Sequence, residues 1–176
     1  MYSNSLICDI LKYINENINS KITIEDIENR YFYNRFYIMK LFKKELRLTI
    51  VEYINSMRIY NSILNIKNTN NNLLNIAYKN GFYSIEYFSE IFKKIIGVNP
   101  MVVKKYFRGN KGISYKNIEI INSSIVRLYE MKTMIDNYLL NQIPIQTKVK
   151  VLTIFKWFIS KSLLIMYSIW YNCYKI

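Results

Sequence analysis

The feature that most constrains this chain is an internal repeat with an offset of fifty residues. Aromatic residues, potential helix caps and basic pairs keep their register in the two copies: Phe32-Tyr33 with Phe82-Tyr83, Asn34 with Ser84, Tyr37 with Tyr87, and Phe42-Lys43-Lys44 with Phe92-Lys93-Lys94. A repeat at a fixed offset indicates two copies of one supersecondary unit. Each copy has the pattern of a short helix, a tight turn and a longer helix with a basic C-terminal end. This is the outline of a helix-turn-helix, and we call the copies the first and the second unit.

Apolar spacing and helix caps predict seven helices in residues 1–109. The expected helices cover residues 6–16, 24–30, 34–45, 49–67, 73–79, 84–96 and 99–106. Residues that favour the N-cap position precede five of them, namely Thr23, Asn34, Thr49, Ser84 and Asn99. The helix over 49–67 is the longest, and we expect it to link the two units.

The longer helix of each unit is expected to bury one face against the helix before it. The apolar residues at this spacing are Ile38, Leu41 and Phe42 in the first unit and Phe88, Ile91, Phe92 and Ile95 in the second. We also assign Tyr37 and Tyr87 to the core, and Val51 to the apolar stripe of the linker helix.

The opposite face of each longer helix is expected to lie in water and to contact DNA. The candidate DNA-binding residues are Asn34, Arg35, Phe36, Met39, Lys40 and Lys43 in the first unit, and Ser84, Ile85, Glu86, Ser89, Glu90 and Lys93 in the second. Arginine and lysine suit the O6 and N7 acceptors of guanine, and methionine or phenylalanine can contact a thymine methyl group. The amides at a capped helix N-terminus can bind phosphate. The alternative for the basic pairs is a solvated charge that complements the helix dipole.

Charge and composition fit a polyanionic partner. The chain has 25 Lys and Arg against 12 Asp and Glu, a net charge of +13, which attracts nucleic acid or an anionic membrane. It has no histidine, and its two cysteines, Cys8 and Cys173, lie at opposite ends without metal-binding spacing. We therefore expect no metal, no cofactor and no catalytic site, and hence no enzyme, and we expect a reducing, cytoplasmic setting.

Residues 7–108 resemble the DNA-binding domain of AraC/XylS-type bacterial transcription regulators. The second unit carries the longer match, through Ile76-Ala77, Gly81-Phe82, Ser84, Tyr87-Phe88-Ser89, Phe92-Lys93-Lys94, Gly97 and Pro100. The first unit and the linker match through Ile24-Glu25-Asp26-Ile27, Leu41-Phe42-Lys43-Lys44, Glu52-Tyr53 and Arg58.

The resemblance implies an all-α domain of seven helices, with two helix-turn-helix units joined by a long linker helix. It also implies that two recognition helices enter successive major-groove segments of double-stranded DNA, in a sequence-specific transcription regulator that works with RNA polymerase. Three residues depart from the family pattern. Glu28 stands at a position that is usually small, Arg47 where a glycine often ends the first recognition helix, and Glu90 where a basic or polar residue is common.

Residues 110–176 form an extension beyond the resemblance, after the linker Gly109-Asn-Lys-Gly112. Residues 118–138 fit either a strand or a helix, and residues 149–171 are strongly apolar. We expect a C-terminal helical extension that is dispensable for DNA binding and supports a homodimer. The alternative function is a cationic membrane-surface protein held by the apolar segment. We do not favour a membrane role, because the unbroken apolar run over 162–171 is about half of the roughly 20 residues that a span needs.

Overall fold

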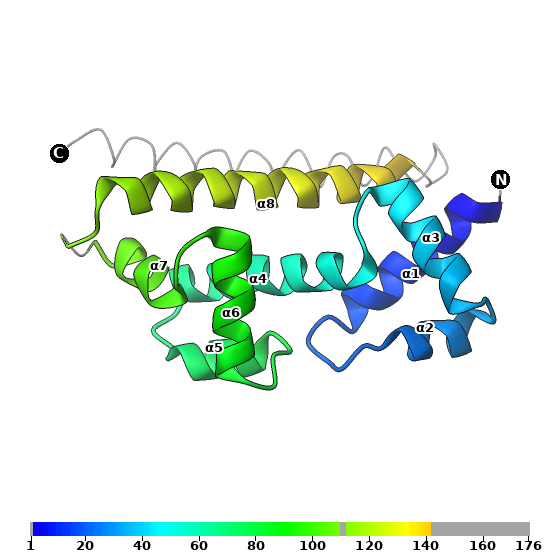
Figure 1. Ribbon diagram of the computed structural model, residues 1–176, viewed down its shortest axis with the longest axis horizontal. Coiled ribbons are helices and arrows are strands. Elements are labelled where there is room, and N and C mark those ends of the chain that lie inside the picture. Colours follow the sequence, from blue (N-terminus) through cyan, green and yellow to red (C-terminus); the bar gives the residue numbers. More distant parts are fainter. Residues whose placement is uncertain (1, 110–111, 142–176) are drawn as a thin grey trace. The chain divides into compact units, whose positions relative to one another are not determined.

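The computed structural model describes residues 2–109 and 112–141, and the regular elements in this part of the chain are all helices (Figure 1). They are α1 (Tyr2–Glu16), α2 (Ile24–Tyr31), α3 (Arg35–Leu46), α4 (Ile50–Asn68), α5 (Leu73–Lys79), α6 (Ile85–Ile96), α7 (Pro100–Phe107) and α8 (Tyr115–Asn141). The all-α fold and the seven helices expected before Gly109 are confirmed. The apolar segment over 149–171 lies outside the described residues.

Side-chain caps determine where the helices begin. The hydroxyl of Thr49 accepts a hydrogen bond from the amide of Glu52 at 3.2 Å, and the Glu52 carboxylate accepts one from the amide of Thr49 at 2.8 Å. Thr23 and Asp26 form the same reciprocal capping box at the start of α2. The three other expected caps are confirmed as well, at Asn34, Ser84 and Asn99.

The repeat holds for the long helices but not for the turns before them. Helices α3 and α6 are each 12 residues long and begin fifty residues apart. In the first unit the left-handed residue of the turn is Phe32, with φ 58°, whereas in the second it is Gly81, with φ 80°. This one-residue difference leaves Phe32 92% exposed and Phe82 1% exposed. The alignment of Phe32 with Phe82 is therefore wrong in three dimensions.

Helix α4 connects the two units, because it contacts α3 and also α5, α6 and α7 (Figure 1). Its buried apolar residues include Ile54, Ile59, Ile63 and Ile66. Val51 was expected in this stripe, but 62% of it is exposed because it lines an open pocket at the start of the helix. None of the described helices is long and apolar enough to cross a membrane.

Helix α8 packs on the second unit. The described residues up to Asp136 form one compact part, so most of α8 belongs with the seven preceding helices. Ile121 and Leu128 join the hydrophobic core of the second unit, and the hydroxyl of Ser124 donates a hydrogen bond to the carbonyl of Ile96 at 2.8 Å. Residues 118–138 are helical rather than a strand. Gly109 as the end of the DNA-binding domain stays a prediction, while the compact part extends to Asp136.

Replacing Gly97 with alanine should lower the free energy of unfolding by about 2–4 kcal/mol. Gly97 ends α6 with φ 91°, and a Cβ atom there would lie 2.8 Å from Cγ2 of Ile120 on α8. The cost combines backbone strain with overpacking of this contact, because the Ile120 methyl group is fixed on a helix. Urea unfolding of the full chain, followed by circular dichroism, measures the effect.

Gly109 provides a control that separates the two parts of this cost. It also has a positive φ of 68°, but a Cβ atom there meets nothing within 4 Å, so Gly109→Ala should show backbone strain alone. Replacing Ile120 with alanine removes the clash. In the Ile120→Ala background, Gly97→Ala should therefore lower the free energy of unfolding by less than it does in the wild type. Equal losses for Gly97→Ala and Gly109→Ala would show that α8 does not press on the end of α6.

Candidate nucleic-acid interface

The outward face of α3 carries exposed cations and apolar groups together. Phe36 is 74% and Met39 48% exposed, and Lys40 and Lys43 are exposed as well. The opposite face, which includes Ile38 and the other predicted apolar residues of α3, is buried. The helix is therefore amphipathic as its spacing indicates, with a free face that is cationic and apolar.

Glu28 connects α2 to the first turn of α3. Its Oε1 accepts a hydrogen bond from the backbone amide of Arg35 at 3.0 Å, and its Oε2 accepts one from Arg35 Nε at 3.0 Å. The second guanidinium nitrogen also lies 3.0 Å from this Oε2. Glu28 thus neutralises Arg35 and occupies a helix amide that could face phosphate. Arg35 is a weaker candidate for base recognition than Lys40 or Lys43.

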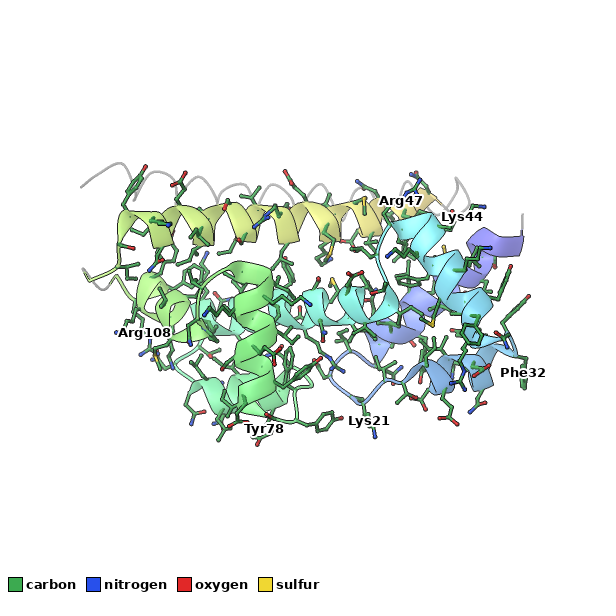
Figure 2. The ribbon with its side chains drawn as sticks, viewed as in Figure 1. Lys21, Phe32, Lys44, Arg47, Tyr78 and Arg108 are labelled. Carbon is green, nitrogen blue, oxygen red and sulfur yellow. The ribbon has the colours of Figure 1, made fainter. Side chains whose placement is uncertain are left out.

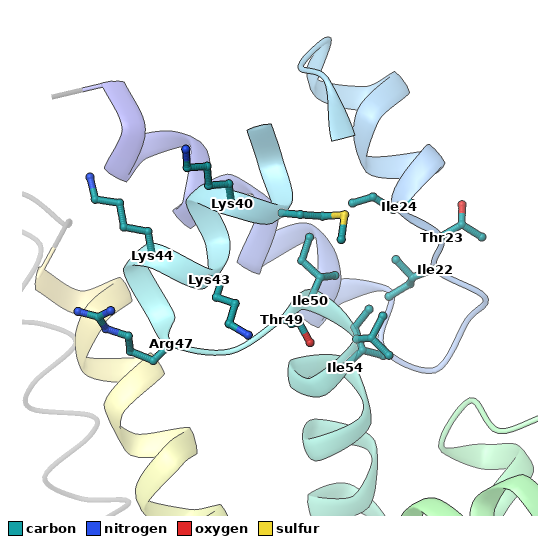
Figure 3. A pocket seen from close by; sticks show the side chains of 12 residues that line it. Ile22, Thr23, Ile24, Lys40, Lys43, Lys44, Arg47, Thr49, Ile50 and Ile54 are labelled. Carbon is teal, nitrogen blue, oxygen red and sulfur yellow. The ribbon is translucent and has the colours of Figure 1, made fainter. Parts of the chain in front are cut away.

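An open pocket of about 590 Å³ lies between α3, the start of α2 and the start of α4 (Figure 3). Its apolar lining includes Ile22, Ile24, Met39, Ile50 and Ile54. Its cationic lining consists of Lys40, Lys43, Lys44 and Arg47. In Figure 3, Lys40 and Lys44 extend away from the isoleucines, and Lys43 reaches toward Thr49.

These four cations form a positive cluster on α3 and its C-cap residue Arg47. Within the described part of the chain, the ion pairs are Lys12–Asp9, Arg35–Glu28 and Lys132–Asp136, so none of the four forms a close ion pair with a carboxylate. Figure 2 shows Lys44 and Arg47 at the C-terminal end of α3. The sequence predicts no contact for Arg47, which stands where a glycine often ends this helix. Its place after two lysines is a signal for a charge contact that sequence reasoning missed.

The outward face of α6 is less positive than that of α3. Glu86 and Glu90 are exposed there with Lys93 and Lys94, so acids and bases balance. The hydroxyl of Ser84 donates a hydrogen bond to Glu86 at 2.5 Å, which lowers the pKa of this carboxyl and keeps it charged. The candidates Ile85 and Ser89 are half-buried. The two units therefore offer different surfaces to a polyanion.

The assignment of Tyr37 and Tyr87 to the core is wrong. Their exposed fractions are 46% and 44%. Tyr37 stacks on Tyr33 with ring centroids 5.5 Å apart, and the Tyr87 hydroxyl accepts a hydrogen bond from Asn55 at 3.4 Å. Both tyrosines lie in the first turn of their helix, beside the buried face, where one side of the ring packs and the other meets solvent. With Phe32, which points away from the ribbon in Figure 2, they add aromatic surface near the outward faces.

Two capped 12-residue helices at the same place in repeated units, joined by a helix of 19 residues, define a protein of the double helix-turn-helix class. A family model described as "Helix-turn-helix domain" matches residues 28–106. The Tn10 TetD protein of Escherichia coli is 31% identical over 110 residues, which cover 62% of this chain and 77% of that protein. The chain belongs to the AraC/XylS-type family of transcription regulators.

Other relatives agree with this membership, and solved structures share the fold. The transcriptional activator AarP of Providencia stuartii is 27% identical over 103 residues, which cover 58% of this chain and 76% of AarP. The melibiose operon regulatory protein of Escherichia coli is 31% identical over 56% of this chain, a match that spans only 33% of that longer protein. A Listeria innocua protein of known structure is 30% identical with a TM-score of 0.53 and covers 56% of this chain and 93% of its own. The DNA-binding domain of AdpA, solved with a target DNA, has a TM-score of 0.56 at 13% identity, over 61% of this chain and 97% of its own.

Proposed function

We propose that this chain is a sequence-specific transcription regulator that inserts α3 and α6 into successive major-groove segments of double-stranded DNA. The observation that carries this proposal is the pair of capped helices with free outward faces at either end of α4. Helix α4 has 19 residues and is therefore about 28 Å long. This length is comparable to one turn of B-DNA, about 34 Å, which usually separates the segments that paired units recognise.

The two recognition helices have different roles in this proposal. Lys40 and Lys43 reach guanine edges or phosphates, and Phe36 and Met39 contact thymine methyl groups. The capped N-termini at Asn34 and Ser84 face phosphates. On α6, Glu86 and Glu90 oppose phosphate contact and are suited to accept from N4 of cytosine, with Ile85, Ser89 and Lys93 beside them. Most of the affinity therefore comes from α3.

The wider setting follows from this role. A regulator that binds the bacterial chromosome works in the cytoplasm and acts on RNA polymerase. We also propose that residues 110–176 support a homodimer, because holding two DNA-binding modules together raises their joint affinity.

The test is a mobility shift of the full chain on a duplex that it selects from a random pool, with excess nonspecific DNA present. Lys40→Ala should weaken binding about fivefold to a hundredfold, the range for loss of a good guanine contact. Glu90→Arg should strengthen binding, mainly to nonspecific DNA, because it replaces an acid that repels phosphates. Lys116→Ala, which removes an exposed charge from α8, is the matched control and should change binding little.

Two results would contradict this account. Selection of no preferred duplex in the presence of competitor would reject sequence-specific binding. A tenfold or greater loss of specific affinity in Glu90→Arg would show that Glu90 recognises a base, and that the electrostatic interpretation of α6 is wrong.

A further inference from the structure

Arg58 lies in the middle of α4 and binds the backbone of the first unit. Only 8% of it is exposed. Its Nε donates a hydrogen bond to the carbonyl of Ile18 at 2.8 Å, and a terminal guanidinium nitrogen donates one to the carbonyl of Ser20 at 2.6 Å. Both acceptors lie in the loop between α1 and α2. The planar fork of arginine suits this double contact, which a single ammonium group would not reproduce.

The same side chain supports the turn of the second unit. The guanidinium carbon lies 5.8 Å from the ring centroid of Phe82. A Cβ atom on Gly81 would lie 3.0 Å from Arg58 Nε and 2.9 Å from the carbonyl oxygen of Ile18. The turn between α5 and α6 therefore rests directly on Arg58 and on the loop that Arg58 binds. One buried side chain touches both units.

Among the described residues, each other side-chain hydrogen bond from α4 to a neighbouring element reaches one unit only. Asn55, which precedes Arg58, donates to the Tyr87 hydroxyl of the second unit at 3.4 Å. Toward the start of α4, the hydroxyl of Tyr53 donates to the Asn15 side chain at 2.7 Å, within the first unit. Toward its end, the Asn65 amide donates to the Asn80 side chain at 3.2 Å, within the second. Arg58 is thus the residue of α4 at which the loop of one unit and the turn of the other meet.

A buried charge is costly unless its hydrogen bonds are satisfied. In the part of the chain that the structure describes, Arg58 forms no ion pair with a carboxylate. Its acceptors are main-chain carbonyls, whose positions depend on the fold of the α1–α2 loop, and an aromatic ring of the other unit. Such a contact is sensitive to how the two units are placed.

We infer that Arg58 is a positioning residue that fixes the separation of α3 and α6, and thereby makes the spacing between the two recognised DNA segments a determinant of specificity. This inference rests on the proposed function. Two modules on a rigid link bind one DNA much more tightly than either alone, but only when the DNA presents both segments at the matching distance. A looser link lowers the affinity for the matching DNA and tolerates other distances better.

The test measures binding of the full chain to the duplex that the wild type selects, and to the same duplex with five base pairs inserted between the two protected segments. The insertion rotates one segment by about half a turn. Joint binding of two modules raises the affinity by about 10²–10⁴-fold. The affinity of the wild type for the inserted duplex should therefore be at least about 100-fold lower than for the intact duplex. Arg58→Met keeps an apolar stem without hydrogen-bond donors. This variant should bind the intact duplex about tenfold more weakly than the wild type does, and its own affinity should fall only about tenfold further on the inserted duplex.

Ile63→Val is the matched control, because it removes one methyl group from the core away from Arg58 and should keep the spacing dependence of the wild type. Arg58→Lys keeps the cation and replaces Arg58→Met if that variant does not fold, with an intermediate effect expected. Equal weakening of both duplexes by the Arg58 variant would overturn the inference. A wild type that selects no duplex rejects the proposed function itself, which is a different result from an altered variant of a binding wild type.

Discussion

Raising the NaCl concentration from 50 to 200 mM should weaken binding of this chain to its selected duplex by about 10³-fold. Six exposed cations lie on the outward sides of α3 and α6 or at their ends, namely Lys40, Lys43, Lys44, Arg47, Lys93 and Lys94. Each phosphate contact adds about 0.9 to the magnitude of the log–log slope of affinity against salt, so six contacts give a slope of about −5. Anisotropy of a labelled duplex over a salt series measures this slope.

Single substitutions show which residues contribute to the salt dependence of the affinity. Lys44→Ala and Arg47→Ala should each reduce its magnitude by about 0.9, whereas Lys116→Ala on α8 should leave it unchanged. A slope near zero for the wild type would rule out phosphate contacts as the main source of affinity. A slope that responds to Lys93 and Lys94 but not to the α3 cations would reverse the proposed roles of the two units.

Ending the chain at Gly109 should reduce the free energy of unfolding by about 3–6 kcal/mol relative to a chain that ends at Asp136. The longer chain keeps Ile121 and Leu128, which are 0% and 6% exposed and belong to the core of the second unit. Burial of one such side chain is worth about 1.5–3 kcal/mol. Since a domain of this size has about 5–15 kcal/mol of stability, the shorter chain approaches the limit of stable folding.

Urea unfolding of both chains tests this prediction. The full-length variant with Ile121→Ala and Leu128→Ala is the control, because it removes the same buried groups and keeps the helix. It should lose a comparable amount of stability. If the chain that ends at Gly109 unfolds at the same urea concentration as the longer chain, then α8 is an accessory, and the boundary expected from the sequence is also the boundary of stable folding.

The helix boundaries could be predicted because their signals are local. A cap acts over two or three residues, as Thr49 does on Glu52, so the sequence contains both partners next to each other. The fifty-residue repeat added a second copy of some of these signals, such as the caps Asn34 and Ser84. For the same reason the outward faces of α3 and α6 followed from helical spacing alone.

The remaining features depend on contacts between distant residues. Arg58 and Ile18 are 40 positions apart, and nothing in the spacing of either residue indicates their hydrogen bond. The different exposure of Phe32 and Phe82 follows from which residue takes the left-handed conformation in each turn, and the pattern of aromatic residues does not show this. The packing of α8 depends on a glycine that leaves room for Ile120, again in a distant part of the chain.

The carboxylate of Glu28 already occupies the first amide of α3 and the side chain of Arg35. A phosphate that approaches this amide must displace Glu28, so contact at this point exchanges one anion for another instead of adding a new one. Such an exchange adds little to the affinity for random DNA. A DNA sequence that also offers an acceptor to the Arg35 guanidinium should be bound more tightly, because the Arg35 amide and the guanidinium then both replace their hydrogen bonds to Glu28. In the proposed complex, Glu28 would therefore compete with phosphate and reduce nonspecific DNA binding by the more basic of the two units.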